Sequence, residues 1–134
     1  MTVEPSGTCP LRSEADIVSS RQIVRGLTQL LKFSLVDQTK MITAASELSR
    51  NTLVHGGGGD MRWELVENGG RRGLRLHFED NGPGIPDMKL ALTDGWTSGG
   101  GMGLGLPGSK RLVSEFEVHT KVGEGTRVII TKWK

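Results

Sequence analysis

Two glycine-containing turns, each set between runs of alternating apolar and polar residues, constrain the fold of this chain more than any other feature. The first turn is Asn68-Gly69-Gly70 and the second is Gly123-Glu124-Gly125. Alternation with a period of two places apolar side chains on one face of a strand, and short glycine turns join adjacent antiparallel strands. The pattern therefore predicts two β-hairpins. The flanking runs are 61–67 and 74–78 for the first turn, and 116–122 and 126–133 for the second.

Helical spacing of apolar residues predicts two helices ahead of the first hairpin. Ser13, with Asp16 three positions later, is typical of an N-cap, and we expect the helix that follows to end near Phe33. Asp37 is expected to cap a second helix, which the glycine run 56–59 ends. The inward-facing stripe of this second helix is predicted to be Met41, Ile42, Ala45, Leu48 and Leu53.

The order of the predicted elements indicates the fold class. Pro107 suits the first turn of a third helix that we expect to run to about Glu115. Residues 1–12 contain Pro5 and Pro10 and are predicted to be an irregular lead-in, with an edge strand at its end as the alternative. The order helix, helix, hairpin, helix, hairpin predicts an α+β two-layer sandwich with helices on one face of a mainly antiparallel sheet. A length of 134 residues predicts a single domain, 1–134.

Composition excludes several classes of function. The formal net charge is only +2, and acidic and basic residues are interspersed, so no basic stripe for nucleic acid is expected. Cys9 is the one cysteine, which excludes a disulfide within the chain and a cysteine-based metal cluster. Three separated histidines predict no zinc site. No signal peptide or apolar run long enough to cross a membrane is present, so we expect a soluble, cytoplasmic protein.

The segment ELSRNTLVH places three polar side chains four residues apart. On a helix, Glu47, Asn51 and His55 project along one face. One interpretation is a solvated helix face. The functional interpretation is that the amide oxygen of Asn51 coordinates Mg²⁺ beside phosphate oxygens, while the carboxylate of Glu47 accepts a proton from an attacking hydroxyl.

The segment EDNGPGIP places an acidic residue directly before a glycine turn. Asp80 ends a predicted strand, and Gly82 and Gly84 let the chain reverse while a flat ring lies close to the backbone. A carboxylate acceptor there suits an exocyclic amine such as N6 of adenine. An ordinary Asx turn is an equally good interpretation of these residues taken alone.

The segment DGWTSGGGMGLGLPG is the richest in glycine. It contains a G-x-G pattern, but no βαβ unit surrounds it and no GKS or GKT follows, so neither a Rossmann fingerprint nor a P-loop is predicted. We expect it to deliver backbone N–H groups and a helix N-terminus to a triphosphate, as a lid that closes on the ligand. The alternative is a simple linker. The residues expected to contact the phosphates are Gly99, Gly100, Gly101, Met102, Gly103, Leu104, Gly105 and Leu106.

In this order the three segments resemble the N, G1 and G2 boxes of the GHKL ATPase superfamily, which has the Bergerat fold, and Gly125-Thr126 resembles its final G-T element. The chain lacks a helix pair carrying a phosphoacceptor histidine. Segments 91–118 and 125–134 are similar to RsbT-type serine/threonine kinases, the anti-sigma-factor kinase branch, and the resemblance covers residues 10–134. It implies a mixed, mainly antiparallel sheet with helices on one face.

The resemblance also implies a role for individual residues. Glu47 resembles the family's general base, Asn51 its Mg²⁺ ligand and Asp80 its adenine anchor, while Thr126 resembles a second contact on the adenine side. Gly82 and Gly84 match the purine-pocket turn, and Gly101, Gly103 and Gly105 the phosphate lid. His55 either lies near the phosphates or packs. Some relatives carry a basic residue where Thr97-Ser98 stands here, so Lys110 or Arg111 is expected to supply that charge.

The family resemblance implies ATP and Mg²⁺ as cofactors, with transfer of phosphate to a serine or threonine. The implied acceptor is a STAS-domain protein of a bacterial stress-response pathway, and the released kinase is expected to activate a PPM-type phosphatase. One alternative is a nucleotide-gated module that sequesters a sigma factor; another is a detached histidine-kinase catalytic domain. Of the remaining residues, Trp63 is expected in the core, Trp96 at a partner or the closed lid, and His77 and His119 in solvent.

Overall fold

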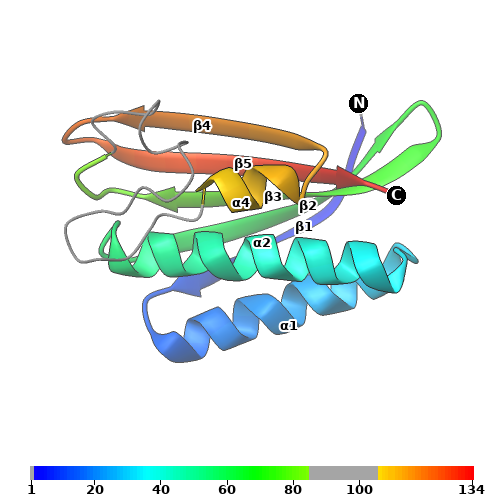
Figure 1. The fold of residues 1–134 in the computed structure, drawn as a ribbon, viewed down its shortest axis with the longest axis horizontal. Coiled ribbons are helices and arrows are strands. Elements are labelled where there is room, and N and C mark those ends of the chain that lie inside the picture. Colours follow the sequence, from blue (N-terminus) through cyan, green and yellow to red (C-terminus); the bar gives the residue numbers. More distant parts are fainter. Residues whose placement is uncertain (1, 85–105) are drawn as a thin grey trace.

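The computed structural model describes residues 2–84 and 106–134 as two layers, a five-stranded sheet and the helices that cover one of its faces (Figure 1). The strand order is β1-β2-β3-β5-β4, and every neighbouring pair is antiparallel. The α+β two-layer prediction is confirmed, although the described sheet is wholly antiparallel rather than mixed. The elements are β1 (Thr2–Leu11), α1 (Glu14–Leu30), α2 (Leu35–Val54), β2 (Gly59–Asn68), β3 (Arg71–Asp80), α4 (Leu106–Arg111), β4 (Glu115–Lys121) and β5 (Gly125–Trp133).

The two long helices begin at serine caps. Ser13 Oγ accepts the backbone N–H of Asp16 at 3.3 Å, which confirms the predicted start of α1. The prediction that Asp37 caps α2 is wrong, because Ser34 Oγ accepts the Asp37 N–H at 3.1 Å and the helix starts three residues earlier. The reason lies in the end of α1, where Lys32 adopts a left-handed φ of 59° and reverses the chain at once. Asp37 therefore sits in the first turn, where its charge suits the helix dipole.

The inward side of α2 contains more small and polar residues than predicted. Met41, Ala45 and Leu48 are buried as expected, whereas Ile42 and Leu53 are only half-buried. The other buried residues of α2 are Ala44, Ser49 and Thr52. Ser49 is tolerated because its hydroxyl pairs with that of Ser20 on α1 at 3.1 Å. This hydrogen bond satisfies both hydroxyls where the two helices pack.

The N-terminal segment is a full edge strand, which corrects the prediction of an irregular lead-in. β1 pairs with β2 along its length, with a register shift between Val3 and Ser6. Pro5 and Pro10 are compatible with this strand because an edge strand leaves half of its N–H groups unpaired. Gly7 provides space for Trp63, since a Cβ at residue 7 would lie 2.7 Å from the indole. Trp63 packs half-buried against the core, as expected.

The two predicted hairpins are confirmed, and the third helix is shorter than predicted. Gly69 and Gly70 form the β2–β3 turn with positive φ values of 59° and 87°. α4 ends at Arg111 rather than near Glu115, because Ser114 N–H already donates to the Thr131 carbonyl at 2.9 Å and strand pairing follows. Pro107 lies in the first turn of α4, as expected.

The two strand histidines differ, and one prediction about them is wrong. His119 is exposed as expected, whereas His77 is buried and its Nε2 contacts the carboxylate of Glu64. Both face away from the helices. His77 is buried because β3 lies in the middle of the sheet, between β2 and β5, whereas His119 stands on the edge strand β4. The pKa of His77 is lowered, mainly by burial, with the contact to Glu64 opposing that effect.

Candidate functional site

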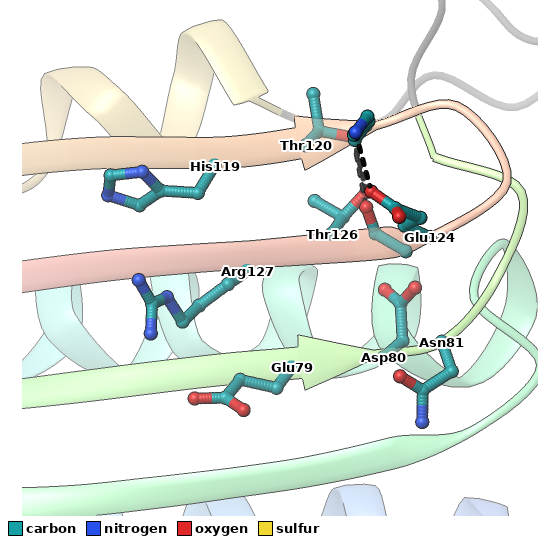
Figure 2. A pocket seen from close by; sticks show the side chains of 10 residues that line it. Glu79, Asp80, Asn81, His119, Thr120, Glu124, Thr126 and Arg127 are labelled. Carbon is teal, nitrogen blue, oxygen red and sulfur yellow. Dashed lines mark hydrogen bonds and ion pairs between the residues drawn. The ribbon is translucent and has the colours of Figure 1, made fainter.

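The C-terminal end of β3 presents a carboxylate to the helix side of the sheet. Asp80 Oδ1 accepts the backbone N–H of Gly82 at 2.9 Å, and the Thr126 N–H also donates to the carboxylate. Residues 74, 76 and 78 of the same strand are buried beneath the helices, and Asp80 continues this alternation. The sequence therefore places a fixed acceptor where the helix layer meets the strand ends (Figure 2).

Burial controls the protonation of this carboxylate. Desolvation raises the pKa of Asp80 above its usual 3.8, and the two backbone hydrogen bonds from Gly82 and Thr126 partly oppose the shift. The two hydrogen bonds favour the charged form of the carboxylate. They use only part of its capacity to accept, so lone pairs remain for a further donor. An acceptor that is held by main-chain groups and partly withdrawn from water suits recognition of an N–H group on a ligand.

Three glycines let the backbone close around Asp80. A Cβ at Gly56 would lie 2.3 Å from Asp80 Cγ, and a Cβ at Gly125 would lie 2.1 Å from the Asp80 carbonyl oxygen. A Cβ at Gly82 would lie 2.7 Å from Gly56 Cα. These contacts bring together the chain after α2, the turn after β3 and the start of β5. Gly82 was predicted to let the chain reverse beside a flat ring; its close approach to Gly56, and the steric role of Gly56, were not identified from the sequence.

Thr126 lies directly across from Asp80 on the neighbouring strand, as its predicted role requires. The cross-strand register pairs Asp80 with Thr126 and Thr126 with Thr120. The hydroxyl oxygens of Thr120 and Thr126 are 2.9 Å apart, and Thr120 Oγ1 donates to the Gly125 carbonyl at 3.2 Å. Thr120 was not identified from the sequence. Its signal was available, since the Gly123-Glu124-Gly125 turn implies that residues near 120 and 126 face each other.

A cavity of about 400 Å³ opens at these strand ends (Figure 2). It includes Asp80 and Thr126 among its lining residues, but residues from the sheet face away from the helices also line it, and Glu47, Asn51 and His55 do not. The cavity therefore overlaps the Asp80 end of the candidate site and does not include the polar face of α2. Its lining residues are Glu79, Asp80, Asn81, His119, Thr120, Lys121, Glu124, Gly125, Thr126 and Arg127.

The predicted polar face of α2 runs toward Asp80. Glu47 is exposed, Asn51 is half-buried one turn later, and His55 is the C-cap. The carbonyl oxygen of Asn51 accepts the N–H groups of His55 at 2.9 Å and Gly56 at 3.1 Å, which closes the helix. Because Gly56 abuts the Asp80 carboxylate, this end of α2 lies at the same edge as the β3 turn.

The other predicted site residues fall into three groups. Gly84 has a φ of 77° and packs on the β4–β5 turn, where a Cβ would lie 2.5 Å from the Lys121 carbonyl oxygen. Leu106 is fully buried in the core, so only its backbone is available to a ligand, whereas Lys110 and Arg111 are exposed at the end of α4. Trp96, Thr97, Ser98 and the predicted phosphate-lid residues 99–105 lie outside the described residues.

In residues 2–84 and 106–134, no group of three or more His, Cys, Asp or Glu side chains is arranged to hold a metal ion. No helix within these residues combines the length and apolar character needed to cross a membrane.

Comparisons with known proteins identify the family of this chain and agree with its fold. The family described as histidine kinase-, DNA gyrase B-, and HSP90-like ATPase matches residues 36–134. The serine/threonine-protein kinase RsbT of Bacillus subtilis is 44% identical over 123 residues, covering 92% of each chain. An anti-sigma F factor of Clostridium novyi is 28% identical, covering 84% of this chain and 82% of the relative. A chain in the crystal structure of the SiaB-SiaC complex from Pseudomonas aeruginosa shares the fold, with a TM-score of 0.56 and 13% identity over 98% of this chain and 91% of that chain.

Proposed function

The chain belongs to the family of histidine kinase-, DNA gyrase B- and HSP90-like ATPases and is an RsbT-like serine/threonine kinase, and we propose that it transfers the γ-phosphoryl group of ATP to a hydroxyl of a partner protein. The observation that carries this proposal is the joint position of Asp80, the end of α2 and Thr126 at one edge of the sheet. The family match implies ATP binding, and the carboxylate of Asp80 supplies the acceptor for the adenine amine.

Glu47 and Asn51 are proposed to act at the phosphate end of the nucleotide. Glu47 is exposed on α2, so its carboxylate is accessible to an incoming serine or threonine and orients that hydroxyl for in-line attack. Positioning and charge neutralisation account for most of the catalysis in phosphoryl transfer. The backbone N–H groups and glycines of residues 99–105, with Lys110 or Arg111, are proposed to contact the phosphates. His55, the C-cap of α2, either lies near the phosphates or packs.

We propose the side chain of Asn51 as a ligand of a magnesium ion. Its amide offers a hard oxygen, the atom type that Mg²⁺ prefers, and Mg²⁺ commonly takes its remaining ligands from phosphate and water. Asn51 is half-buried one helical turn after Glu47, so one face of α2 presents both the base and the metal ligand. When bound, the ion neutralises charge on the β- and γ-phosphates.

The proposed partners follow from the family branch. We assign the phosphoacceptor to a STAS-domain protein of a bacterial partner-switching pathway, and the released kinase to activation of a PPM-type phosphatase in the cytoplasm. The 44% identity to RsbT across 92% of both chains supports this branch. Neither nucleic acid nor a membrane is proposed as a partner.

A transfer assay with labelled ATP and a STAS-domain protein tests the proposal. Glu47→Ala should reduce transfer at least about 100-fold, the lower end of what a general base contributes, while ATP affinity stays within about threefold. Asn51→Ala should weaken ATP binding in the presence of Mg²⁺ and leave binding in EDTA unchanged. Thr43→Ala is the matched control, because Thr43 is exposed one turn before Glu47 on the same helix. Undiminished transfer by Glu47→Ala would remove this residue from the mechanism.

A second candidate function is a nucleotide-gated anti-sigma module with little or no turnover. The 28% identity to an anti-sigma F factor favours keeping it. In the same assay this module would bind ATP and a sigma factor without labelling a STAS-domain protein. Acid-labile label on the acceptor would instead indicate phosphohistidine and a histidine-kinase catalytic domain.

A further inference from the structure

The two edge strands of the sheet differ in how they are protected from pairing with a further strand. β1 contains Pro5 and Pro10, which have no N–H to donate, and its register on β2 shifts once. β4 contains no proline and pairs with β5 in continuous register from Glu115 to Lys121. It forms the other edge of the sheet in the described part of the chain (Figure 1). β4 therefore directs a row of main-chain donors and acceptors away from β5.

The exposed side chains of β4 follow a symmetric pattern of charge. Exposed and half-buried residues alternate along the strand, and the exposed ones lie on the sheet face away from the helices. Two acidic residues, Glu115 and Glu117, precede Val118, and two basic residues, His119 and Lys121, follow it. An acidic and a basic side chain thus stand at equal distances from the middle residue of the strand.

We propose that β4 is a docking edge for a second copy of this chain, paired antiparallel with the two Val118 residues opposite each other. Residues directly opposite in an antiparallel pair lie on the same face, with Cβ atoms about 4.5–5.5 Å apart. In this register Glu115 lies opposite Lys121, and Glu117 lies opposite His119. Because the pairing is two-fold symmetric, each contact occurs twice. Pairing through β4 requires no nucleotide, so it does not rest on the proposed function.

The charges of β4 also specify the direction and the register of this pairing. A slip of two residues would place Glu117 opposite Glu117 in one direction and His119 opposite His119 in the other. Parallel pairing in register would place every residue opposite its own copy. Like charges directly opposite each other are destabilising. Antiparallel pairing about Val118 is therefore the register that brings an acidic and a basic side chain together at all four exposed positions.

The contacts that three of these side chains make within the chain leave the pairing possible. His119 Nε2 lies 3.4 Å from a Glu117 carboxylate oxygen, and Lys121 Nζ lies 3.3 Å from a Glu124 carboxylate oxygen. All four side chains are more than half exposed. Ion pairs between exposed side chains contribute little to stability, so these contacts can exchange for contacts with a second copy.

The carboxylate of Glu115 is held in place at the start of β4. Its Oε2 accepts the indole N–H of Trp133 at 2.5 Å, and its Oε1 lies 3.8 Å from the Arg75 guanidinium. Half of the side chain remains exposed, so the carboxylate can still accept from Lys121 of a second copy. Little side-chain entropy is then lost on pairing, because the intrachain contacts already order this group.

The test uses two variants that should pair poorly with themselves and well with each other. Glu117→Lys places an ammonium group opposite His119, and His119→Glu places two carboxylates opposite each other. We expect each change to raise the Kd of self-association about tenfold, measured by sedimentation equilibrium. An equimolar mixture of the two variants restores unlike contacts, so its Kd should return close to the wild-type value. Both side chains are more than half exposed, so neither change should disturb folding.

Glu79→Lys is the matched control for Glu117→Lys. Glu79 is exposed on the same sheet face, but it stands on β3 in the middle of the sheet. The substitution changes the charge equally at a distance from the edge, so the Kd should stay within about twofold of wild type. A loss equal to that in Glu117→Lys would indicate that two sheets pack face to face, and would overturn pairing through β4.

Hydrogen exchange of wild-type protein gives an independent readout at the backbone. Amides of β4 that point away from β5 should become protected as the protein concentration rises, whereas amides of β1 should not change. Protection of β1 in place of β4, or no recovery of association in the mixture of variants, would contradict the proposal. A wild-type protein that stays monomeric up to about 1 mM would also overturn it, and would leave the kinase proposal intact.

Discussion

The glycines around Asp80 and the glycines at the outer turns are required for different structural reasons. A Cβ at Gly56, Gly82 or Gly125 would overlap neighbouring backbone or the Asp80 carboxylate. A Cβ at Gly57 or Gly123 would meet nothing within 4 Å, although both residues have positive φ. The first group is required by close approach and the second only by backbone conformation. Substitutions at the two groups should therefore affect different measurements.

The largest effect is expected at the β4–β5 turn, where Gly123 and Gly125 form a matched pair. Gly125→Ala combines a φ of 99° with a Cβ 2.1 Å from the Asp80 carbonyl oxygen, whereas Gly123→Ala has a φ of 82° and open space. We expect Gly125→Ala to lower the free energy of unfolding by about 2–6 kcal/mol and Gly123→Ala by about 1–2 kcal/mol. Urea unfolding measures both. Equal losses would show that steric crowding at Asp80 does not distinguish the two positions.

A smaller and more selective effect is expected after α2, where Gly56 and Gly57 are adjacent. Gly56→Ala would push against the Asp80 carboxylate, and we expect ATP affinity to fall about 10- to 100-fold, as for loss of a hydrogen bond to a charged group. Gly57→Ala, with its φ of 75°, should lower stability by about 1–2 kcal/mol and leave ATP affinity unchanged. Calorimetric titration of ATP into the two folded variants measures both affinities. Equal ATP affinities of Gly56→Ala and Gly57→Ala would contradict the proposed closeness of Gly56 to the adenine site.

The smallest effect is expected in the pH dependence of stability. Burial raises the pKa of Asp80, so the folded protein holds this proton more tightly than the unfolded chain. The unfavourable contribution of the Asp80 carboxylate to folding stability is therefore absent below pH 3.8. It grows as the pH rises toward the raised pKa and is constant above that pKa. We expect the stability of wild type relative to Asp80→Asn to decline as the pH rises from 3.8 through the raised pKa of Asp80, and to stay constant above it. A difference that does not vary with pH would show that the packed glycines do not desolvate the carboxylate.

The features that the sequence predicted well depend on residues close together in the chain. Ser13 and Asp16 define the start of α1, and the two glycine turns define the hairpins. The acceptor and donor of the Asp80–Gly82 hydrogen bond are only two residues apart, so the turn that fixes the carboxylate can be read locally. The order of these elements then restricts the fold to helices on an antiparallel sheet.

The features that the sequence missed depend on contacts between distant residues. The choice of Ser34 over Asp37 as the α2 cap follows from where α1 reverses, and the burial of His77 follows from the central place of β3 in the sheet. The steric role of Gly56 requires knowing that the chain after α2 reaches the β3 turn. None of these follows from local periodicity.

The donors that orient Asp80 belong to the main chain, and this has a consequence for redesign. Because the N–H groups of Gly82 and Thr126 hold the carboxylate, the side chain at position 126 can be exchanged without removing either donor. To change the purine that the proposed site accepts, an engineer would therefore conserve the glycines as a scaffold and vary positions 80 and 126 together. Such a library keeps the geometry of the recognition edge and changes only its pattern of donors and acceptors.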